Sequence, residues 1–207
     1  MAKLTLTTFV SLDGVMQAPG GPDEDTTGGF EYGGWMVPFA DDGLGAFINE
    51  VFDRSGAYLL GRRTYDIFSF YWPEVTDPQD PVAARLNTLP KHVVSRTLTE
   101  PEWENTTVVR GDVPAEVARL KEQTAEGELQ IHGSGTLAQF LLAHGLIDEV
   151  NLIVHPVYLG RGRRLFADGG EPTAFELTGA RTTGSGIAIH TYRPAGRARF
   201  GTFEQDV

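Results

Sequence analysis

The chain has 207 residues, of which 41% are hydrophobic and 22% are charged, a composition typical of a globular protein with one sizeable core. The net charge of −11 argues against general nucleic-acid binding, and the lack of cysteine excludes disulfides and thiolate metal sites. No apolar stretch approaches a signal peptide or a membrane helix, so we expect a cytoplasmic protein that does not bind membranes.

The chain begins with a predicted strand at residues 3–10, where polar and apolar residues alternate. Residues 17–45 are rich in glycine, proline and acids, and a loop of that length in a compact domain is usually functional. The loop also carries four aromatic residues, Phe30, Tyr32, Trp35 and Phe39. They indicate either a lid over a ligand or an anchor that pins the loop to the body.

Strands and helices alternate through the rest of the chain. The expected helices cover 44–54, 62–68, 112–124 and a segment after Gly135 that Gly145 ends, and a loop is expected around 72–81. The expected strands cover 57–60, 91–95, 107–109, 129–132 and 149–155, with a closing antiparallel pair at 174–182 and 186–193. This order predicts one domain over 1–193, with a mainly parallel sheet flanked by helices, and a weakly ordered tail at 194–207.

A glycine-rich turn, Gly133-Ser134-Gly135-Thr136-Leu137-Ala138, follows a predicted strand and opens a helix. Glycines allow close approach of the backbone to phosphate, and a helix N-terminus supplies free N–H groups. The pattern does not fit a true Rossmann fingerprint, because that motif lies on the first strand of a larger unit. The segment therefore indicates phosphate binding outside a Rossmann fold, or a tight turn with a purely structural role.

Two more segments have phosphate-binding chemistry at the end of a predicted strand. Leu60-Gly61-Arg62-Arg63-Thr64 combines two guanidinium groups with a helix start, and Val94-Ser95-Arg96-Thr97 places a hydroxyl beside an arginine. The second arrangement suits a terminal phosphate such as the 2′-phosphate of NADPH. Since ligands of open α/β sheets bind beyond the carboxyl ends of strands, we expect the three segments to share one groove. The alternative is that these arginines only balance local charge.

Taken together, these segments resemble the dihydrofolate reductase superfamily, and within it the branch of riboflavin-pathway pyrimidine reductases. The resemblance spans most of the chain in the family's order. It also includes Ser11-Leu12-Asp13-Gly14 and the stretch from Gly145 through Pro156-Val157-Tyr158-Leu159-Gly160 to Phe166. It implies an α/β fold, a three-layer α/β/α sandwich with a mixed, mainly parallel sheet and an antiparallel C-terminal edge. It also implies NADPH as cofactor and hydride transfer to a C=N or C=O group of a small heterocycle.

The resemblance also implies roles for individual residues. Gly61, Arg62, Arg63 and Thr64 would hold the cofactor phosphates, and Ser95 and Arg96 would meet the 2′-phosphate. The pyrophosphate would lie against Gly133, Ser134, Gly135, Thr136 and Leu137. Phe9 and Val10, with the Asp13-Gly14 turn, would border the nicotinamide.

Substrate-side residues are less defined by the sequence. Dihydrofolate reductases carry a pterin-binding acid near the position of Gly45, and none of the acids nearby, Asp41, Asp42 and Glu50, is clearly equivalent. We therefore expect a substrate other than dihydrofolate. Asp13 is the predicted proton donor, with turn formation or delivery by water as alternatives, and Trp35 is predicted to stack on the substrate.

Other functions remain open at the level of sequence. No residue spacing suggests a metal site, and His132 and His155 are interpreted as packing or capping residues. The chain could instead be a catalytically inactive nucleotide-binding protein, or a true dihydrofolate reductase. The resemblance also implies a homodimer, and the apolar strand at 187–189 suits either an interface or the core.

Overall fold

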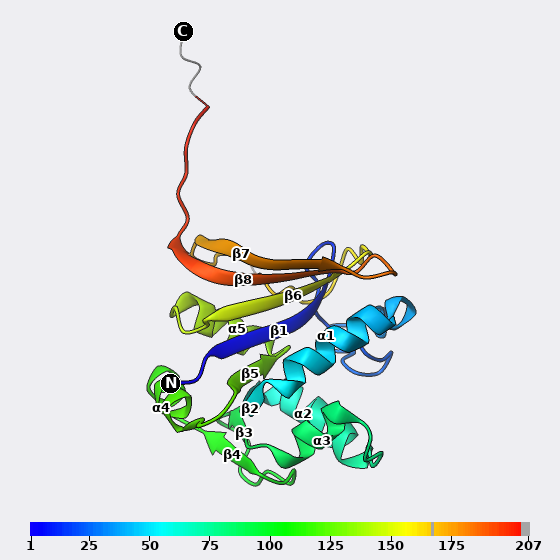
Figure 1. Cartoon of the computed structure of the whole chain (residues 1–207), viewed down its shortest axis with the longest axis vertical. Coiled ribbons are helices and arrows are strands. Elements are labelled where there is room, and N and C mark those ends of the chain that lie inside the picture. The colour runs from blue at the N-terminus through cyan, green and yellow to red at the C-terminus, as the bar shows by residue number, and fades with distance from the viewer. Residues whose placement is uncertain (167, 204–207) are drawn as a thin grey trace.

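The computed structural model describes residues 1–166 and 168–203. Figure 1 shows one twisted sheet with helices packed against it. The helices are α1 (Asp42–Asp53), α2 (Arg62–Tyr71), α3 (Pro81–Thr88), α4 (Val113–Gln123) and α5 (Gly135–Ala143), with short 3₁₀ turns η1 (Val37–Phe39) and η2 (Trp72–Glu74). The strands are β1 (Leu4–Ser11), β2 (Ser55–Gly61), β3 (Lys91–Val94), β4 (Thr106–Val109), β5 (Glu128–His132), β6 (Glu149–His155), β7 (Thr173–Thr182) and β8 (Ala188–Arg197).

The sheet has the order β4-β3-β2-β5-β1-β6-β8-β7. The first six strands in this order, from β4 to β6, pair in parallel with their neighbours. Strand β8 runs antiparallel to both β6 and β7. The predicted parallel sheet with an antiparallel C-terminal edge is therefore confirmed. The parallel order brings the carboxyl ends of β1, β2, β3, β4 and β5 to one edge.

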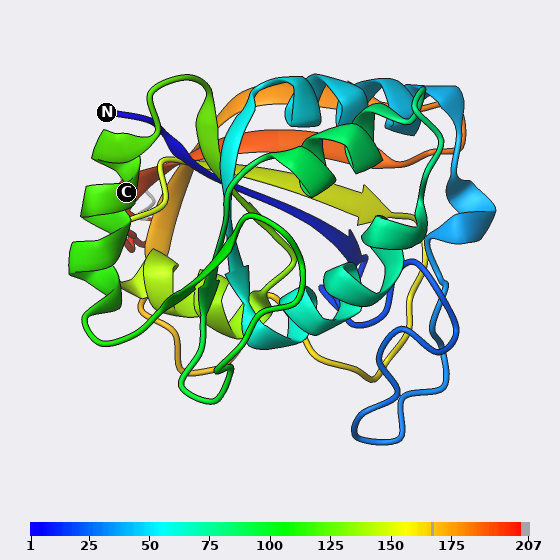
Figure 2. The ribbon, with the colours of Figure 1, turned by 90° about the horizontal axis from the view of Figure 1, so that it is seen from below.

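Successive side chains of β1 point to opposite faces of the sheet. Leu4 and Leu6 pack with the apolar faces of α4 and α5. Thr5 and Thr7 point to the opposite face, where α1 covers the sheet together with α2 and α3, as Figure 2 shows from below. The result is the expected three-layer sandwich, with one apolar cluster beneath α4 and α5 and two on the side of α1, α2 and α3.

Helix α3 was not predicted, although its sequence carries a start signal. The carboxylate of Asp80 accepts hydrogen bonds from the N–H groups of Val82 and Ala83, and Pro81 occupies the first helical turn. Ala83 and Leu86 are the residues it buries. A helix of only two turns offers too few apolar repeats for periodicity to reveal it, so the cap was the available signal.

The loop at 17–45 is anchored to the body rather than free. Phe30 and Trp35 are buried in a cluster with Val15 and Ala18, and the indole N–H of Trp35 donates to the Gln17 carbonyl at 2.7 Å. Of the two predicted roles for its aromatic residues, these two residues therefore perform the anchoring one. A role as a lid stays a prediction for the exposed part of the loop, which includes Tyr32.

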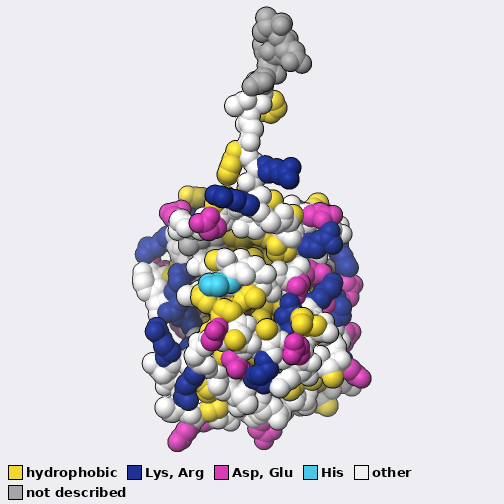
Figure 3. Space-filling model, turned by 90° about the vertical axis from the view of Figure 1, so that its left-hand side faces the viewer, with side chains coloured by type: hydrophobic (Ala, Val, Ile, Leu, Met, Phe, Trp, Pro, Cys, Tyr) yellow, Lys and Arg dark blue, Asp and Glu magenta, His cyan; other side chains and the backbone are white. Residues whose placement is uncertain are grey.

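The C-terminal end of the fold differs from its predicted boundary. Strand β8 continues to Arg197, beyond residue 193, and the described residues after it project away from the body (Figures 1 and 3). Residues 204–207 of the predicted tail lie outside the described residues. Figure 3 also shows acidic and basic side chains interspersed on one face. Within the described part of the chain, no helix is both long and apolar enough to span a membrane.

Candidate active site

Two helix starts are joined by reciprocal hydrogen bonds at the carboxyl ends of β2 and β5. The Ser134 N–H donates to Thr64 Oγ1 at 3.0 Å, and the Gly61 N–H donates to Ser134 Oγ at 3.0 Å. These bonds hold the first turn of α2 beside the first turn of α5. Because neither helix has a side-chain cap, the N–H groups of both first turns are open to a ligand.

The turn before α5 requires an unusual backbone. Gly133 has φ of +56° and Ser134 has φ of +51°, both in the left-handed region. Glycine adopts this conformation without cost, whereas serine pays about 1–2 kcal/mol for it. The two hydrogen bonds that Ser134 makes to the α2 segment offset that cost and fix the turn that starts the helix.

The third predicted segment is connected to the second. Ser95 Oγ accepts from the N–H groups of Thr97 and Leu98, so this hydroxyl shapes the turn after β3. The Arg62 guanidinium bonds the Thr97 hydroxyl at 3.3 Å. Arg96 is exposed and has no ion-pair or hydrogen-bond partner within residues 1–166 and 168–203, which leaves its guanidinium available to an anion.

All three segments line one open groove of about 2530 Å³. Eleven of the twelve predicted cofactor residues lie on its wall: Gly61, Arg62, Arg63, Thr64, Ser95, Arg96, Gly133, Ser134, Gly135, Thr136 and Leu137. The volume exceeds the roughly 300–1,000 Å³ of a typical small-molecule site, so it can accept a cofactor and a second molecule together. The sequence-based expectation of a shared groove is met.

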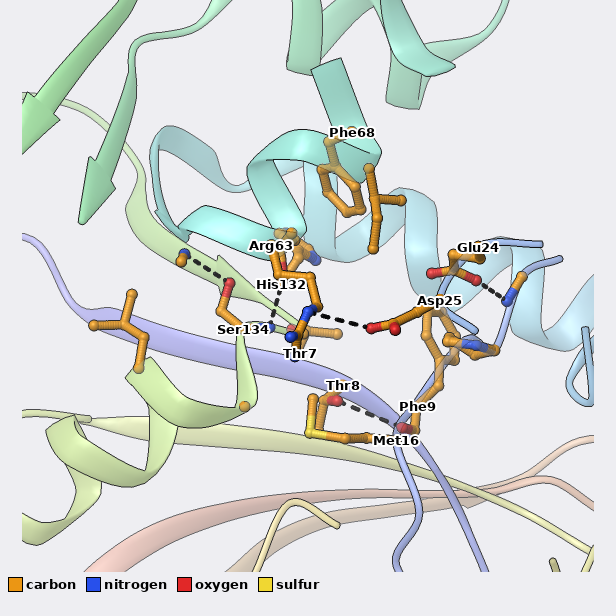
Figure 4. Close-up of a pocket in the computed structure, with 18 of the residues that line it drawn as sticks. Thr7, Thr8, Phe9, Met16, Glu24, Asp25, Arg63, Phe68, His132 and Ser134 are labelled. Atoms are coloured by element: carbon orange, nitrogen blue, oxygen red, sulfur yellow. Dashed lines mark hydrogen bonds and ion pairs between the residues drawn. The ribbon is translucent and has the colours of Figure 1, made fainter. Parts of the chain in front are cut away.

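An acid of the long loop reaches into this groove. The Asp25 carboxylate lies 3.5 Å from the Arg63 guanidinium (Figure 4). It also pairs with Arg163, and Thr27 donates to it. Although burial of the Asp25 side chain opposes ionisation, the hydrogen bonds from Thr27 and the two arginines keep its pKa below the ordinary value. Asp25 therefore connects the loop to the groove wall at Arg63.

Beside the helix starts, the groove continues over the face of the sheet that α1 covers. Thr7, Phe9 and His132 line it from the strands, and Ile48 and Asn49 line it from α1. Figure 4 shows Phe9 and Met16 opposite Phe68 of α2, with Thr7 and His132 between them. This part of the groove, which we call the chamber, is mostly apolar and has a few polar groups, as substrate sites usually do.

Comparison with known proteins shows which family has this architecture. The model of the RibD C-terminal domain matches residues 2–189. The chain belongs to the RibD C-terminal domain family. Two relatives from Bacillus subtilis strain 168, the uncharacterized proteins YyaP and YwjB, are 26% and 25% identical. The alignments cover 92% of this chain in each case, and 94% and 98% of the two relatives.

Solved structures support the same fold for this RibD-type domain. A putative riboflavin biosynthesis protein from Shewanella sp. PV-4 matches with a TM-score of 0.66 and 24% identity, covering 94% of this chain and 99% of that one. A pyrimidine reductase-like protein from Corynebacterium diphtheriae matches with a TM-score of 0.61 and 12% identity, covering 93% and 92%. The Acinetobacter baumannii RibD matches at 0.66 and 16%, covering 94% of this chain and 58% of that longer chain.

The RibD-type domain differs from the predicted site at Val10. Val10 is buried in the core beneath α5 and does not line the groove, whereas Phe9 does. The reason is the two-residue period of a strand, since neighbouring side chains on β1 point to opposite faces. Val10 is therefore corrected from a cofactor contact to a core residue.

The geometry does not support Asp13 as a catalytic or substrate-binding residue. Its carboxylate accepts from the Ser11 hydroxyl at 2.7 Å and from the N–H groups of Leu159 and Gly160, pairs with Arg164, and does not line the groove. Desolvation opposes ionisation, but these hydrogen bonds prevail and lower the pKa of Asp13 to about 2. A carboxyl group this acidic is a poor proton donor near neutral pH. Asp13 braces the turn after β1 against the 159–164 segment.

Trp35 is also corrected. Its side chain is 6% exposed, meets the His155 ring edge-on at 5.3 Å between centroids, and does not line the groove. It anchors the long loop and has no free face for stacking on a substrate.

The acids near the expected pterin-binding position are committed to other contacts. Asp41 caps α1 by accepting from Leu44 N–H and also accepts from Ser185 N–H, and these bonds lower its pKa. Glu50 pairs with Arg181 at 2.8 Å, and Asp42 does not line the groove. The α1 residue with a polar side chain at the chamber is Asn49, which is uncharged. Asp41 also lines the groove, but its carboxylate is held by the N–H groups of Leu44 and Ser185; a substrate other than dihydrofolate stays a prediction.

Several groove residues were missed or read only structurally from the sequence. His132 was interpreted as a packing residue, and its ring does stack on Phe52 with centroids 4.6 Å apart, but it also lines the groove. Asp25 and Arg163 meet across the fold from segments far apart in the chain, so no local pattern could have paired them. In residues 1–166 and 168–203, no group of three or more His, Asp or Glu side chains is arranged to hold a metal ion.

Proposed function

We propose that this RibD-type domain is an NADPH-dependent reductase that acts on a C=N or C=O group of a small pyrimidine-like heterocycle. The observation that carries the proposal is the pair of uncapped helix starts joined through Ser134, which face one groove together with Arg62, Arg63 and Arg96. Free N–H groups of two helix starts beside guanidinium groups are suited to the negative oxygens of a dinucleotide, although Arg62 also pairs with Asp66 and Arg63 with Asp25.

The donor groups of the groove are suited to NADPH. The first turn of α5, from Gly135 to Leu137, would hold the pyrophosphate, and the first turn of α2 would add Arg62 and Thr64. Arg96 would bind the 2′-phosphate, because its guanidinium has no other partner in the described structure. When bound, NADPH supplies the hydride. Phe9 and Met16 would exclude water from the reacting face of the ring.

The proposed proton source is Glu24 rather than Asp13. Glu24 lines the groove, and its burial raises its pKa although the N–H groups of Gly20 and Gly21 bind its carboxylate. A raised pKa keeps part of the population protonated closer to neutral pH. A Glu24→Gln variant should keep its NADPH affinity and lose the basic limb of the kcat profile, because a proton donor stops working as the pH rises through its pKa. An unchanged profile would leave delivery by water as the source.

The substrate class follows from relatives and from the chamber. One structural neighbour, from Thermotoga maritima, is a diaminohydroxyphosphoribosylaminopyrimidine deaminase/5-amino-6-(5-phosphoribosylamino)uracil reductase, and this chain covers 57% of it. The neutral side chains of Asn49 and His132 in the chamber are consistent with a neutral pyrimidine ring. NADPH oxidation should therefore occur with aminouracils and not with dihydrofolate.

The deciding experiment compares NADPH with NADH in titrations of the wild type and of Arg96→Ala. We expect the wild type to prefer NADPH, and Arg96→Ala to lose at least about tenfold of that preference, the value of one charge-assisted contact. An unchanged preference would contradict the role of Arg96. Binding without turnover on any heterocycle would favour the inactive nucleotide-binding alternative, and turnover of dihydrofolate would favour a true dihydrofolate reductase.

A homodimer in the cytoplasm is also part of the proposal. Ile187 and Ile189 are buried against α1, which supports the core alternative for the strand at 187–189. The outer strand β7, where Leu177 is 53% exposed, is the remaining C-terminal surface for association. Gel filtration at the mass of a monomer would remove this part.

A further inference from the structure

Two nearly buried polar residues form part of the chamber floor. Thr7 and His132 lie opposite each other in the parallel register of β1 and β5, and they are 2% and 7% exposed. Both line the groove, and Figure 4 shows their side chains close together between Phe9 and Ser134. Any molecule in the chamber therefore meets these two side chains as a pair.

The hydrogen bonds of Gln130 determine which nitrogen of His132 carries the proton. The Gln130 amide nitrogen donates to the Val51 carbonyl at 2.7 Å and to the Glu128 carboxylate at 3.2 Å, and both partners accept only. The amide oxygen is then the atom 3.1 Å from His132 Nε2, so Nε2 must be the donor. Burial lowers the pKa of His132 to about 4, so the ring is neutral near pH 7 and Nδ1 holds a lone pair.

The lone pair of Nδ1 faces the groove. Within residues 1–166 and 168–203, the buried side-chain nitrogen and oxygen atoms without a partner are Thr5 Oγ1 and His155 Nε2. His132 Nδ1 also has no hydrogen-bond partner among these residues, but it is not one of the buried atoms. Since His132 lines the groove, Nδ1 is accessible from the groove. Stacking on Phe52, with an interplanar angle of 12°, fixes the ring. The chamber thus contains a rigid, neutral hydrogen-bond acceptor.

Thr7 supplies the complementary donor. Its Oγ1 accepts from the Asn151 amide nitrogen at 3.1 Å, while the Asn151 amide oxygen accepts from Thr191. The Thr7 hydroxyl proton has no acceptor among the described residues, so it remains free for a ligand. A donor and an acceptor then stand next to each other on adjacent strands.

We propose that Thr7 and His132 bind the lactam edge, –NH–C(=O)–, of a neutral heterocycle such as a uracil-type ring. The ring N–H donates to His132 Nδ1, and the neighbouring carbonyl accepts from the Thr7 hydroxyl. Phe9 and Ile48 contact the apolar faces of the ring. This inference rests on the proposed reductase function and specifies which edge of the substrate the chain reads. It also explains how the chamber binds a substrate without an acid on α1.

The test uses two probes, 5,6-diaminouracil and its 1,3-dimethyl analogue, in which both ring N–H groups are blocked. Calorimetric titration in the presence of NADPH should give at least about tenfold tighter binding of the unmethylated ring, which corresponds to about 1.4 kcal/mol. The affinity should be constant between pH 6 and pH 8, because His132 stays neutral. Nitrogen-15 NMR of the free protein should show a protonated Nε2 and an unprotonated Nδ1.

Variants distinguish recognition of the lactam edge from effects on folding. His132→Phe keeps the stack on Phe52 but removes the acceptor, so both probes should bind equally. Thr7→Val should weaken binding of 5,6-diaminouracil, because the ring carbonyl loses its donor, while Thr7→Ser retains the hydroxyl and should keep the affinity. Equal binding of the two probes by the wild type, no binding of 5,6-diaminouracil, or a protonated Nδ1 would each overturn the inference. A separate titration with NADPH tests the proposed function. Failure to bind NADPH would overturn the reductase proposal, whereas NADPH binding with equal affinity for the two probes would overturn only the lactam inference.

Discussion

The left-handed serine at the start of α5 gives a quantitative test of how the two helix starts are joined. In Ser134→Ala the Gly61 N–H loses its acceptor at a partly buried position, and an unpaired donor there costs about 1–2 kcal/mol, the lower part of the range for buried donors. The alanine also keeps the unfavourable φ of +51°. Ser134→Gly loses the same hydrogen bond but relieves about 1 kcal/mol of backbone cost. The alanine variant should therefore be the less stable of the two by about 1 kcal/mol.

Thermal and urea denaturation measure this difference directly. A loss of about 2 kcal/mol in a chain of this length lowers Tm by roughly 4–8 °C. The matched control is Ser69→Ala on α2, where the hydroxyl makes an exposed contact of 3.3 Å with the Asp66 carbonyl, and its stability should stay close to that of the wild type. If Ser134→Ala were as stable as the control, or Ser134→Gly were less stable than Ser134→Ala, the reasoning would be refuted.

Three further predictions concern the residues that hold the loops. Because the pKa of Asp13 is lowered to about 2, its contribution to stability is fully present above about pH 4 and is lost as the pH falls toward 2, so Asp13→Asn should flatten that part of the pH dependence of the urea midpoint. Trp35→Phe should cost about 1 kcal/mol through loss of the hydrogen bond to Gln17 and leave kcat/KM unchanged; a large fall in kcat/KM without loss of stability would restore Trp35 as a substrate contact. Asp25→Asn should destabilise the protein by about 1.5–3 kcal/mol and raise protease sensitivity in the loop, whereas unchanged sensitivity would show that its pairing with Arg63 does not hold the loop.

Local patterns in the sequence were sufficient for the sheet and for the phosphate-binding wall. Alternation identified β1, and the glycine turns identified the starts of α2 and α5, because these features depend on neighbouring residues. The parallel strand order then brings strand ends to one edge whatever the connecting loops do. This is why Thr64, Arg96 and Ser134 could be placed in one groove before the fold was known.

The substrate side could not be read in the same way. Phe9 and Val10 were both assigned to the nicotinamide, but neighbouring residues of a strand point to opposite faces, so only Phe9 lines the groove. Asp13 and Trp35 have suitable chemistry for catalysis and stacking, but long-range contacts with Leu159, Gly160 and His155 commit them to structure. His132 acquires its role from Gln130 and Phe52, which local spacing cannot reveal.

The central claim is that the first turns of α2 and α5 grip a single dinucleotide. The most direct test follows backbone amide shifts by NMR while NADPH is added to the wild type. The amides of residues 62–64 and 135–137 should shift together and saturate at one common Kd. Shifts confined to one of the two helices, or saturation at two separate concentrations, would contradict the claim.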